Sequence, residues 1–136
     1  MASFPAQSCC YQGFKYDGQP QGSVSMVDDF EVYTSHPPSK STENGILILT
    51  DITGHRVPNA QLIADQFAMN GYFVIMPDMF YGDAVPLNKP GEFDMQKWRN
   101  GGYHPKRKSH LPSTVDPIVE SCLREMRTKF NCKVFY

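Results

Sequence analysis

The segments GILILTD (residues 45–51) and GYFVIMPD (residues 71–78) decide the fold of this chain. Each contains an unbroken apolar run, and runs without polar alternation are typical of strands buried on both faces. The residues between them are predicted to form a helix, because Pro58 suits its first turn and Gly71 suits its C-terminal cap. The apolar side chains that recur there at helical spacing are Leu62, Ile63, Ala64, Phe67 and Ala68.

A strand, a helix and a second strand within about 30 residues make a βαβ unit. We therefore expect two parallel strands in a mostly parallel sheet that helices cover on both faces. Toward the N-terminus, residues 23–33 suit two short antiparallel strands joined by a tight turn at Asp28 and Asp29. Residues 1–22 are predicted to be an irregular arm. The sequence predicts the α/β class and a single domain over residues 1–136.

Farther along the chain, residues 79–113 lack sustained periodicity apart from a short helix around 93–98, and they favour an ordered loop over a pocket. Asp116 is then predicted to cap another helix, with Pro117 in its first position and Asn131 as a left-handed cap. The apolar stripe of this helix consists of Ile118, Val119, Cys122, Leu123, Met126 and Phe130. A third strand is predicted to begin at Lys133.

Composition narrows the class of protein. The chain has 136 residues, 40% of them hydrophobic, which is enough for one core. With 13 basic and 14 acidic residues and a net charge of -1, it offers no broad surface for nucleic acid or anionic membrane, so a small ligand is the expected partner. No apolar run approaches the roughly 18 residues of a membrane span. The sequence predicts a cytoplasmic protein without a membrane anchor.

The four cysteines are Cys9, Cys10, Cys122 and Cys132, and no CxxC pair or Cys/His ligand spacing occurs. We predict reduced thiols, no bound metal and no cofactor. Cys122 falls on an apolar stripe and is predicted to pack in the core.

Polar residues follow both central strands, where ligands of open α/β sheets bind. Asp51, Ile52, Thr53 and His55 are well placed to line a site, although Asp51 equally suits hydrogen bonds within its own turn. Asp78 and Asp83 follow the second strand at the same end of the sheet. They suit turn capping better than an acid/base pair or a metal site, because their spacing matches no known motif.

The remaining candidate residues and motifs give weaker evidence of catalysis or binding. His55 has the chemistry of a base, but the sequence supplies no nucleophile to partner it. Neither a GxSxG motif nor a phosphate-binding glycine loop is present. For the basic run 106–108 and for Ser109 and His110, a solvated surface is favoured over a nuclear-import or phosphate site.

Five motifs follow one another along the chain: ILILTDITGH (46–55), NAQLIADQFA (59–68), GYFV (71–74), MPDMF (76–80) and GDAVP (82–86). In this order they closely resemble the fungal-type branch of the dienelactone hydrolase family, within the α/β-hydrolase superfamily. The cysteine pair near the start, KW (97–98) and VDPIVE (115–120) look like the same family. The resemblance covers nearly the whole chain.

The resemblance implies a Cys-His-Asp triad that cleaves a small ester or lactone, with the cysteine in a Gly-x-Cys-x-Gly elbow. It also implies that the Ile52 N–H contributes to the oxyanion hole. Asp51 occupies the place of an acidic residue close to the nucleophile. Supporting roles around the pocket are expected for Thr53, Gly54, His55 and Asp83. Bacterial members carry an arginine at the position of Gly82, so a preference for acidic lactones is not expected.

The family pattern would continue beyond residue 133 into the elbow, and no triad residue is recognised in this chain. We therefore expect a truncated α/β-hydrolase fold that lacks the C-terminal strands and helices and is inactive alone. A splice donor encoded by Lys133-Val134 would explain the short length. The alternative is a non-catalytic remnant that binds a small ligand or associates with a full-length homologue. In both cases the exposed sheet edge is expected to favour self-association.

Overall fold

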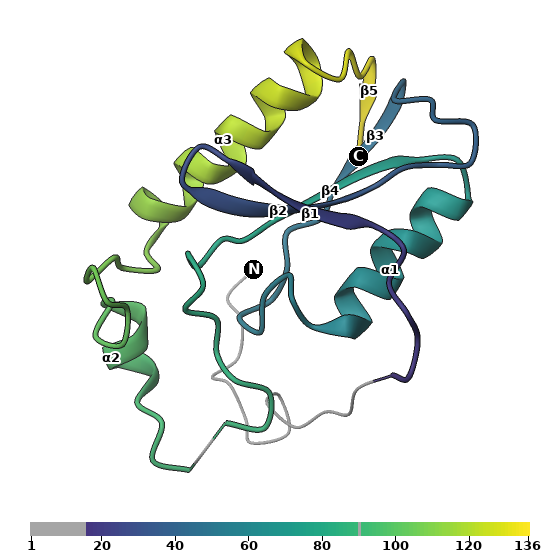
Figure 1. The fold of residues 1–136 in the computed structure, drawn as a ribbon. Helices are drawn as coiled ribbons and strands as arrows, with labels where there is room; N and C mark the ends of the chain where they lie inside the picture. Colours follow the sequence, from purple (N-terminus) through teal and green to yellow (C-terminus); the bar gives the residue numbers. More distant parts are fainter. Residues whose placement is uncertain (1–15, 90) are drawn as a thin grey trace.

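The structure is a computed structural model and describes residues 16–89 and 91–136. Its centre is a five-stranded mixed sheet in the order β1-β2-β4-β3-β5, with helices α1 and α3 on opposite sides (Figure 1). The strands are β1 (Ser23–Val27), β2 (Phe30–Ser35), β3 (Asn44–Leu47), β4 (Phe73–Pro77) and β5 (Val134–Phe135). The helices are α1 (Pro58–Met69), α2 (Met95–Arg99) and α3 (Pro112–Thr128). The predicted α/β class is confirmed.

The strand directions follow the sequence prediction. β1 and β2 form an antiparallel hairpin through Asp28 and Asp29, and Asp28 has a φ of 50°. β2 is antiparallel to β4, whereas β3 is parallel to both β4 and β5. The carboxyl ends of the parallel strands and the start of β2 therefore lie at the same end of the sheet. The chain segment there carries the residues of the candidate site.

The two central strands differ in burial. Every residue of β4 is buried, as predicted. The expected strand 46–49 instead ends at Leu47, and Leu49 is 51% exposed. The β3 segment is less buried than β4 because of where the helices lie. α3 packs on β4 and β3, whereas α1 packs mainly on β4 and β2. The face of β3 on the α1 side is left partly open.

Helix α1 has the predicted bounds, but its buried side was predicted incorrectly. Ala64 and Ala68 face the sheet, while Ile63 and Phe67 are 55% and 42% exposed. Small side chains let the helix axis approach the strands closely, so the bulky residues lie at its side. Beside the alanines the helix buries a carboxylate, that of Asp65. Asn70 is the C-cap, and Gly71 follows with a φ of 99°.

Helix α3 begins earlier than predicted. Pro112 occupies its first turn and Pro117 lies inside the helix, so the expected cap at Asp116 is wrong. Pro112 takes the terminal position where a missing N–H costs nothing, which makes the later proline an internal one. The predicted stripe is confirmed, since Cys122 is buried and burial raises the pKa of its thiol to about 12. Asn131 has the predicted left-handed conformation, with a φ of 53°.

The segment between β4 and α3 is packed against the rest of the chain. This segment contains α2, whose bounds are close to those of the predicted short helix. Trp98 of α2 is buried with Phe80 in an apolar cluster. Lys108 was predicted to be solvated, but its Nζ lies 2.5 Å from Asp29 and 3.3 Å from the ring centre of Tyr81. This ion pair ties the long segment to the β1–β2 hairpin.

Two sequence predictions, the reduced thiols and the N-terminal arm, fall partly outside the described residues. Cys9 and Cys10 lie outside them. Of the predicted arm, residues 16–22 are described and belong to no helix or strand. Among the helices of the described residues, none combines the length and hydropathy that a bilayer crossing needs.

Candidate functional site

The loops after β3 and β4 meet at the carboxyl end of the parallel strands. The N–H of Val85 donates a 2.8 Å hydrogen bond to the carbonyl of Ile52. Gly54, with a φ of 80°, lies so close to Ala84 that an added Cβ would be 2.8 Å from the Ala84 Cβ. The two segments that the sequence assigned to one rim are therefore in direct contact.

Asp51 stabilises its own turn. Its Oδ1 accepts hydrogen bonds from the N–H of Thr53 at 2.8 Å and from the Thr53 hydroxyl at 2.5 Å. The N–H of Gly54 donates to the Asp51 carbonyl at 3.1 Å. The structure thus contains the turn-capping arrangement considered for Asp51. The carboxylate is exposed, and among the described residues nothing donates to its Oδ2.

Ile52 is held at this turn through its carbonyl and through the Asp51 cap. Within residues 16–89 and 91–136, no group accepts a hydrogen bond from its backbone N–H. Gly54, two residues after Ile52, is buried and packs the turn against the neighbouring loop at Ala84. The result is a free backbone donor on a fixed loop.

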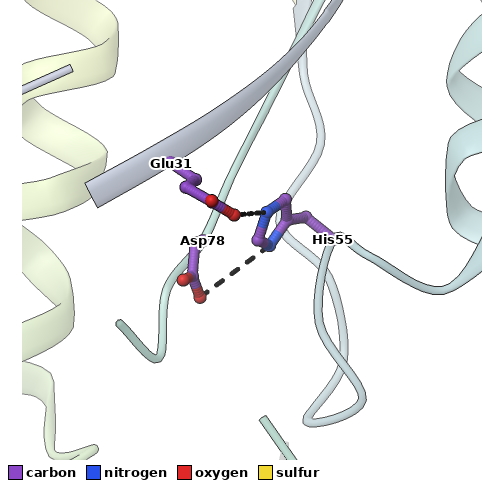
Figure 2. A group of neighbouring side chains, drawn as sticks. All are labelled: Glu31, His55 and Asp78. Carbon is purple, nitrogen blue, oxygen red and sulfur yellow. Dashed lines mark hydrogen bonds and ion pairs between the residues drawn. The ribbon is translucent and has the colours of Figure 1, made fainter. Parts of the chain in front are cut away.

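His55 lies under the loop and not in an open rim. The residue is 2% exposed, and its ring has Nε2 3.0 Å from Glu31 Oε2 and Nδ1 3.8 Å from Asp78 Oδ1 (Figure 2). The three side chains come from β2, the loop after β3 and the end of β4. His55 therefore connects three elements that sequence alone did not place together.

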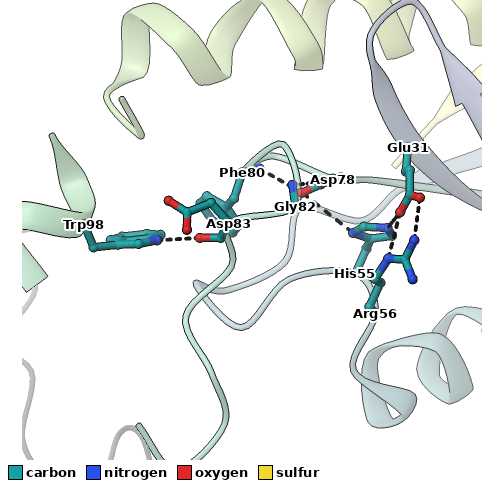
Figure 3. Close-up of polar contacts among 8 residues, drawn as sticks. All are labelled: Glu31, His55, Arg56, Asp78, Phe80, Gly82, Asp83 and Trp98. Carbon is teal, nitrogen blue, oxygen red and sulfur yellow. Dashed lines mark hydrogen bonds and ion pairs between the residues drawn. The ribbon is translucent and has the colours of Figure 1, made fainter. Parts of the chain in front are cut away.

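Each carboxylate around His55 already has protein donors. Arg56 binds both oxygens of Glu31, at 2.8 and 2.5 Å. Hydrogen bonding to Arg56 lowers the pKa of Glu31, although burial acts in the opposite direction. The hydrogen bond with His55 lowers the pKa of Glu31 further. Asp78 accepts from the N–H groups of Phe80 and Gly82 at 2.9 and 2.6 Å, so it caps the turn after β4 (Figure 3).

The ligand atoms of Glu31, His55 and Asp78 lie within 4.8 Å of one another, which is close enough for a metal ion. The donor set does not fit one, because both oxygens of each carboxylate are engaged by N–H groups and a guanidinium occupies Glu31. We interpret the cluster as a structural tie that fixes the loop carrying Ile52.

Asp83 has a partner that the sequence did not reveal. Its Oδ2 lies 2.8 Å from His110 Nε2, and its carbonyl accepts a 2.6 Å hydrogen bond from Trp98 Nε1. His110 was predicted to be solvated, but it is buried under the Trp98 ring at 4.5 Å between ring centres. Aromatic residues at 80 and 98 were the only signal for this burial. Trp98 and His110 thus fasten the long segment to the loop after β4, and Figure 3 shows the bond from Trp98 to the Asp83 carbonyl.

Replacing Glu31 by glutamine is expected to lower the free energy of unfolding by about 1 kcal/mol at pH 7, because the pair is partly exposed. The folded-state pKa of Glu31 is lowered, so its contribution is present above the ordinary value and is lost as pH falls through the folded value. Urea unfolding of both proteins at about pH 7 and about pH 3 measures this difference. The gap between them should close at the lower pH.

Glu43→Gln provides the matched control, since Glu43 pairs with Lys133 at the exposed surface. An equal pH dependence for the two glutamine variants would contradict the role assigned to Glu31.

Comparisons with known proteins agree on one family. The model of the dienelactone hydrolase family matches residues 30–132. Hydrolase tropI of Talaromyces stipitatus is 74% identical over 133 residues, which cover 98% of this chain and 52% of that protein. Dienlactone hydrolase 1 of Gibberella moniliformis is 31% identical over 133 residues, which cover 93% of this chain and 47% of that protein.

A solved structure is also similar, that of a soluble variant of monoglyceride lipase from Saccharomyces cerevisiae. The TM-score is 0.41 at 16% identity, covering 88% of this chain and 35% of the lipase. The chain spans about half the length of the curated relatives it matches.

Proposed function

The chain belongs to the dienelactone hydrolase family, and on this premise we propose that it forms the oxyanion-stabilising half of a site that cleaves a small ester or lactone. The resemblance found in the sequence motifs is confirmed by the family match over residues 30–132. The mixed sheet with helices on both faces agrees with a truncated α/β-hydrolase fold.

The observation that supports this role is the free N–H of Ile52 on a fixed loop. An oxyanion hole needs donors that are already in place before charge develops on the substrate oxygen. The Ile52 carbonyl is bound by Val85, and Asp51 holds the next turn. These contacts leave the N–H as the group available to an incoming oxyanion.

Asp51 is proposed to act on the nucleophile. Its Oδ1 is engaged by Thr53, and its Oδ2 is left for a thiol brought close to the loop. A carboxylate beside a thiol influences the protonation and orientation of that thiol. We assign the supporting roles proposed from the sequence to four residues. Thr53 and Gly54 lie in the turn, His55 lies beneath the turn, and Asp83 lies in the loop after β4, which the turn contacts.

The nucleophile itself must come from another segment. No Gly-x-Cys-x-Gly occurs in the sequence, and Cys122 is buried on α3 with a raised pKa. We propose that the 136-residue chain alone does not turn over. Gly82 stands where bacterial members carry an arginine, so a preference for acidic lactones is not part of the proposal. The balanced net charge argues against a nucleic-acid partner. The free, buried thiols Cys122 and Cys132 suit a reducing compartment such as the cytoplasm.

A chimera tests this function. Residues 1–133 of this chain would be joined to the second half of the Talaromyces stipitatus hydrolase, and hydrolysis of a small aryl ester and a small neutral lactone would be measured. We expect turnover by the chimera and only background hydrolysis by the pure 136-residue chain. A chimera that melts cooperatively but does not hydrolyse either substrate would refute the proposed role. Turnover by the chain alone would refute its dependence on a second segment.

A further inference from the structure

Strand β1 forms one edge of the sheet, and the geometry of its hairpin decides which backbone groups face outward. The two-residue turn makes Val27 and Phe30 the closing hydrogen-bonded pair of the hairpin. Backbone groups alternate in direction along an antiparallel strand, so those of Val24 and Met26 point away from β2. Among the described residues, no backbone group of another strand or loop bonds to the N–H or the carbonyl of either residue.

In the described part of the chain, this edge carries none of the features that ordinarily keep a strand from pairing further. Proteins protect such edges with lysine, proline, a bulge, or a covering helix or loop. β1 reads SVSMV, and its register with β2 runs without a bulge. Val24 and Met26 are 46% and 61% exposed, on the sheet face opposite to Val27, which packs against the core beneath α3. The edge is therefore uncharged, partly apolar and open to another strand.

We propose that β1 is a dimerisation edge, at which two copies of this chain pair their β1 strands antiparallel about a twofold axis through Ser25. In this register Val24 of each copy lies opposite Met26 of the other. Each such pair exchanges both of its backbone hydrogen bonds, so every outward group of the two residues gains a partner. The sheets of the two copies then form one continuous sheet.

Other twofold registers satisfy fewer of these groups. An axis through Val24 would place Met26 opposite Gly22, whose N–H already donates to the Tyr33 hydroxyl at 2.8 Å. An axis through Met26 would place Val24 opposite Asp28, which lies in the turn with a φ of 50° and outside the strand. The backbone alone therefore favours the central axis.

The side chains fit the same register. Ser25 meets its own copy at the axis as a non-hydrogen-bonded pair, where the Cα atoms are about 4.5 Å apart and a small residue is accommodated best. Val24 packs beside Met26 of the other copy on the opposite face, as an apolar cross-strand pair. The acidic turn residues 28–29 lie opposite residues 21–22, which carry no charge, so no like charges oppose each other.

This dimer is independent of the proposed function and of the other sheet edge. The two β1 strands run in opposite directions across the axis, so the candidate sites of the two copies lie at opposite ends of the joint sheet. Self-association was expected from the sequence at the edge of the third predicted strand, which is β5. β1 lies at the other end of the strand order.

Cross-linking through an introduced cysteine tests the register. Ser25→Cys places two thiols face to face at the axis, within the reach of a disulfide, so mild oxidation should convert most of the chain into a covalent dimer. Ser23→Cys is the matched control on the same strand face. In the proposed register Ser23 lies opposite Val27 of the other copy, so the two introduced thiols are about 13 Å apart along the strands and should not cross-link.

The native thiols are kept out of this measurement. Cys9 and Cys10 would be replaced by serine in every protein, and Cys122 and Cys132 are buried. The same pair of variants in the chimera should give the same result, which separates pairing at β1 from association at the β5 edge.

Sedimentation equilibrium measures the pairing without a cross-link. Val24→Pro removes an outward N–H and no hydrogen bond to β2, so it should raise the dissociation constant of the dimer about tenfold or more. Val24→Thr is the control, because it keeps the N–H and a β-branched side chain, and it should stay within about threefold of the parent. Circular dichroism verifies that both variants are folded.

Three outcomes would overturn the proposal. One is a chain that stays monomeric at every concentration. Another is equal cross-linking of the Ser25→Cys and Ser23→Cys variants. The third is a dimer that Ser25→Cys does not cross-link and Val24→Pro does not weaken, because that dimer would form through another surface.

Discussion

Replacing Asp65 by alanine is expected to lower the free energy of unfolding by about 3 to 5 kcal/mol. Asp65 is 8% exposed. Its carboxylate accepts three hydrogen bonds, from the Gln21 N–H at 2.6 Å and from the hydroxyls of Tyr33 and Ser35 at 2.7 Å each. Alanine would leave two buried hydroxyls without their acceptor. Chemical denaturation monitored by circular dichroism measures the loss.

Two variants separate this effect from that of any change in α1. Gln66→Ala alters the adjacent exposed residue and should be close to neutral. Tyr33→Phe removes one of the three donors and should cost about 1 kcal/mol, because the carboxylate keeps its other partners. A loss below about 1 kcal/mol for Asp65→Ala would show that the buried carboxylate contributes little net stability.

Asp65 also marks the limit of the sequence argument for the fold. Periodicity predicted the bounds of α1, and an unbroken apolar run predicted the burial of β4. Neither pattern revealed that the helix approaches the sheet through Ala64 and Ala68, because hydrophobicity alone favours the larger side chains. The hydrogen bonds of Asp65 reach back 30 and 32 residues to β2, and local sequence carries no signal for them.

In the candidate site too, local contacts could be predicted from the sequence and long-range contacts could not. Asp51, Thr53 and Gly54 are close in sequence, so their turn was accessible to local reasoning about strand ends. The contact of Glu31 with His55 spans 24 residues, and that of Asp83 with His110 spans 27. Such pairs depend on strand order and on the path of the long segment. His55 was predicted to line the site and His110 to be solvated, because local sequence carries no signal for a partner so far along the chain.

Replacing Gly54 by alanine is expected to destabilise the chain by about 2 to 4 kcal/mol. Two effects add, since Gly54 has a φ of 80° and a new Cβ would lie 2.8 Å from the Ala84 Cβ. Gly82→Ala is the matched control, because its φ is 83° but no atom lies within 4 Å of the added Cβ. Denaturation of both variants should show a loss of about 1 kcal/mol for Gly82→Ala, from backbone strain alone.

The double variant Gly54→Ala with Ala84→Gly completes the test. Removing the Ala84 methyl group relieves the contact and leaves the backbone strain, so the double variant should recover about half of the loss. Equal losses for Gly54→Ala and Gly82→Ala would show that the two loops are not fixed against each other. In the chimera, Gly54→Ala is expected to lower kcat on the order of 10²-fold, because it displaces the loop that presents the Ile52 N–H. Gly82→Ala should leave kcat within about threefold of the parent, since the added Cβ would meet no atom within 4 Å.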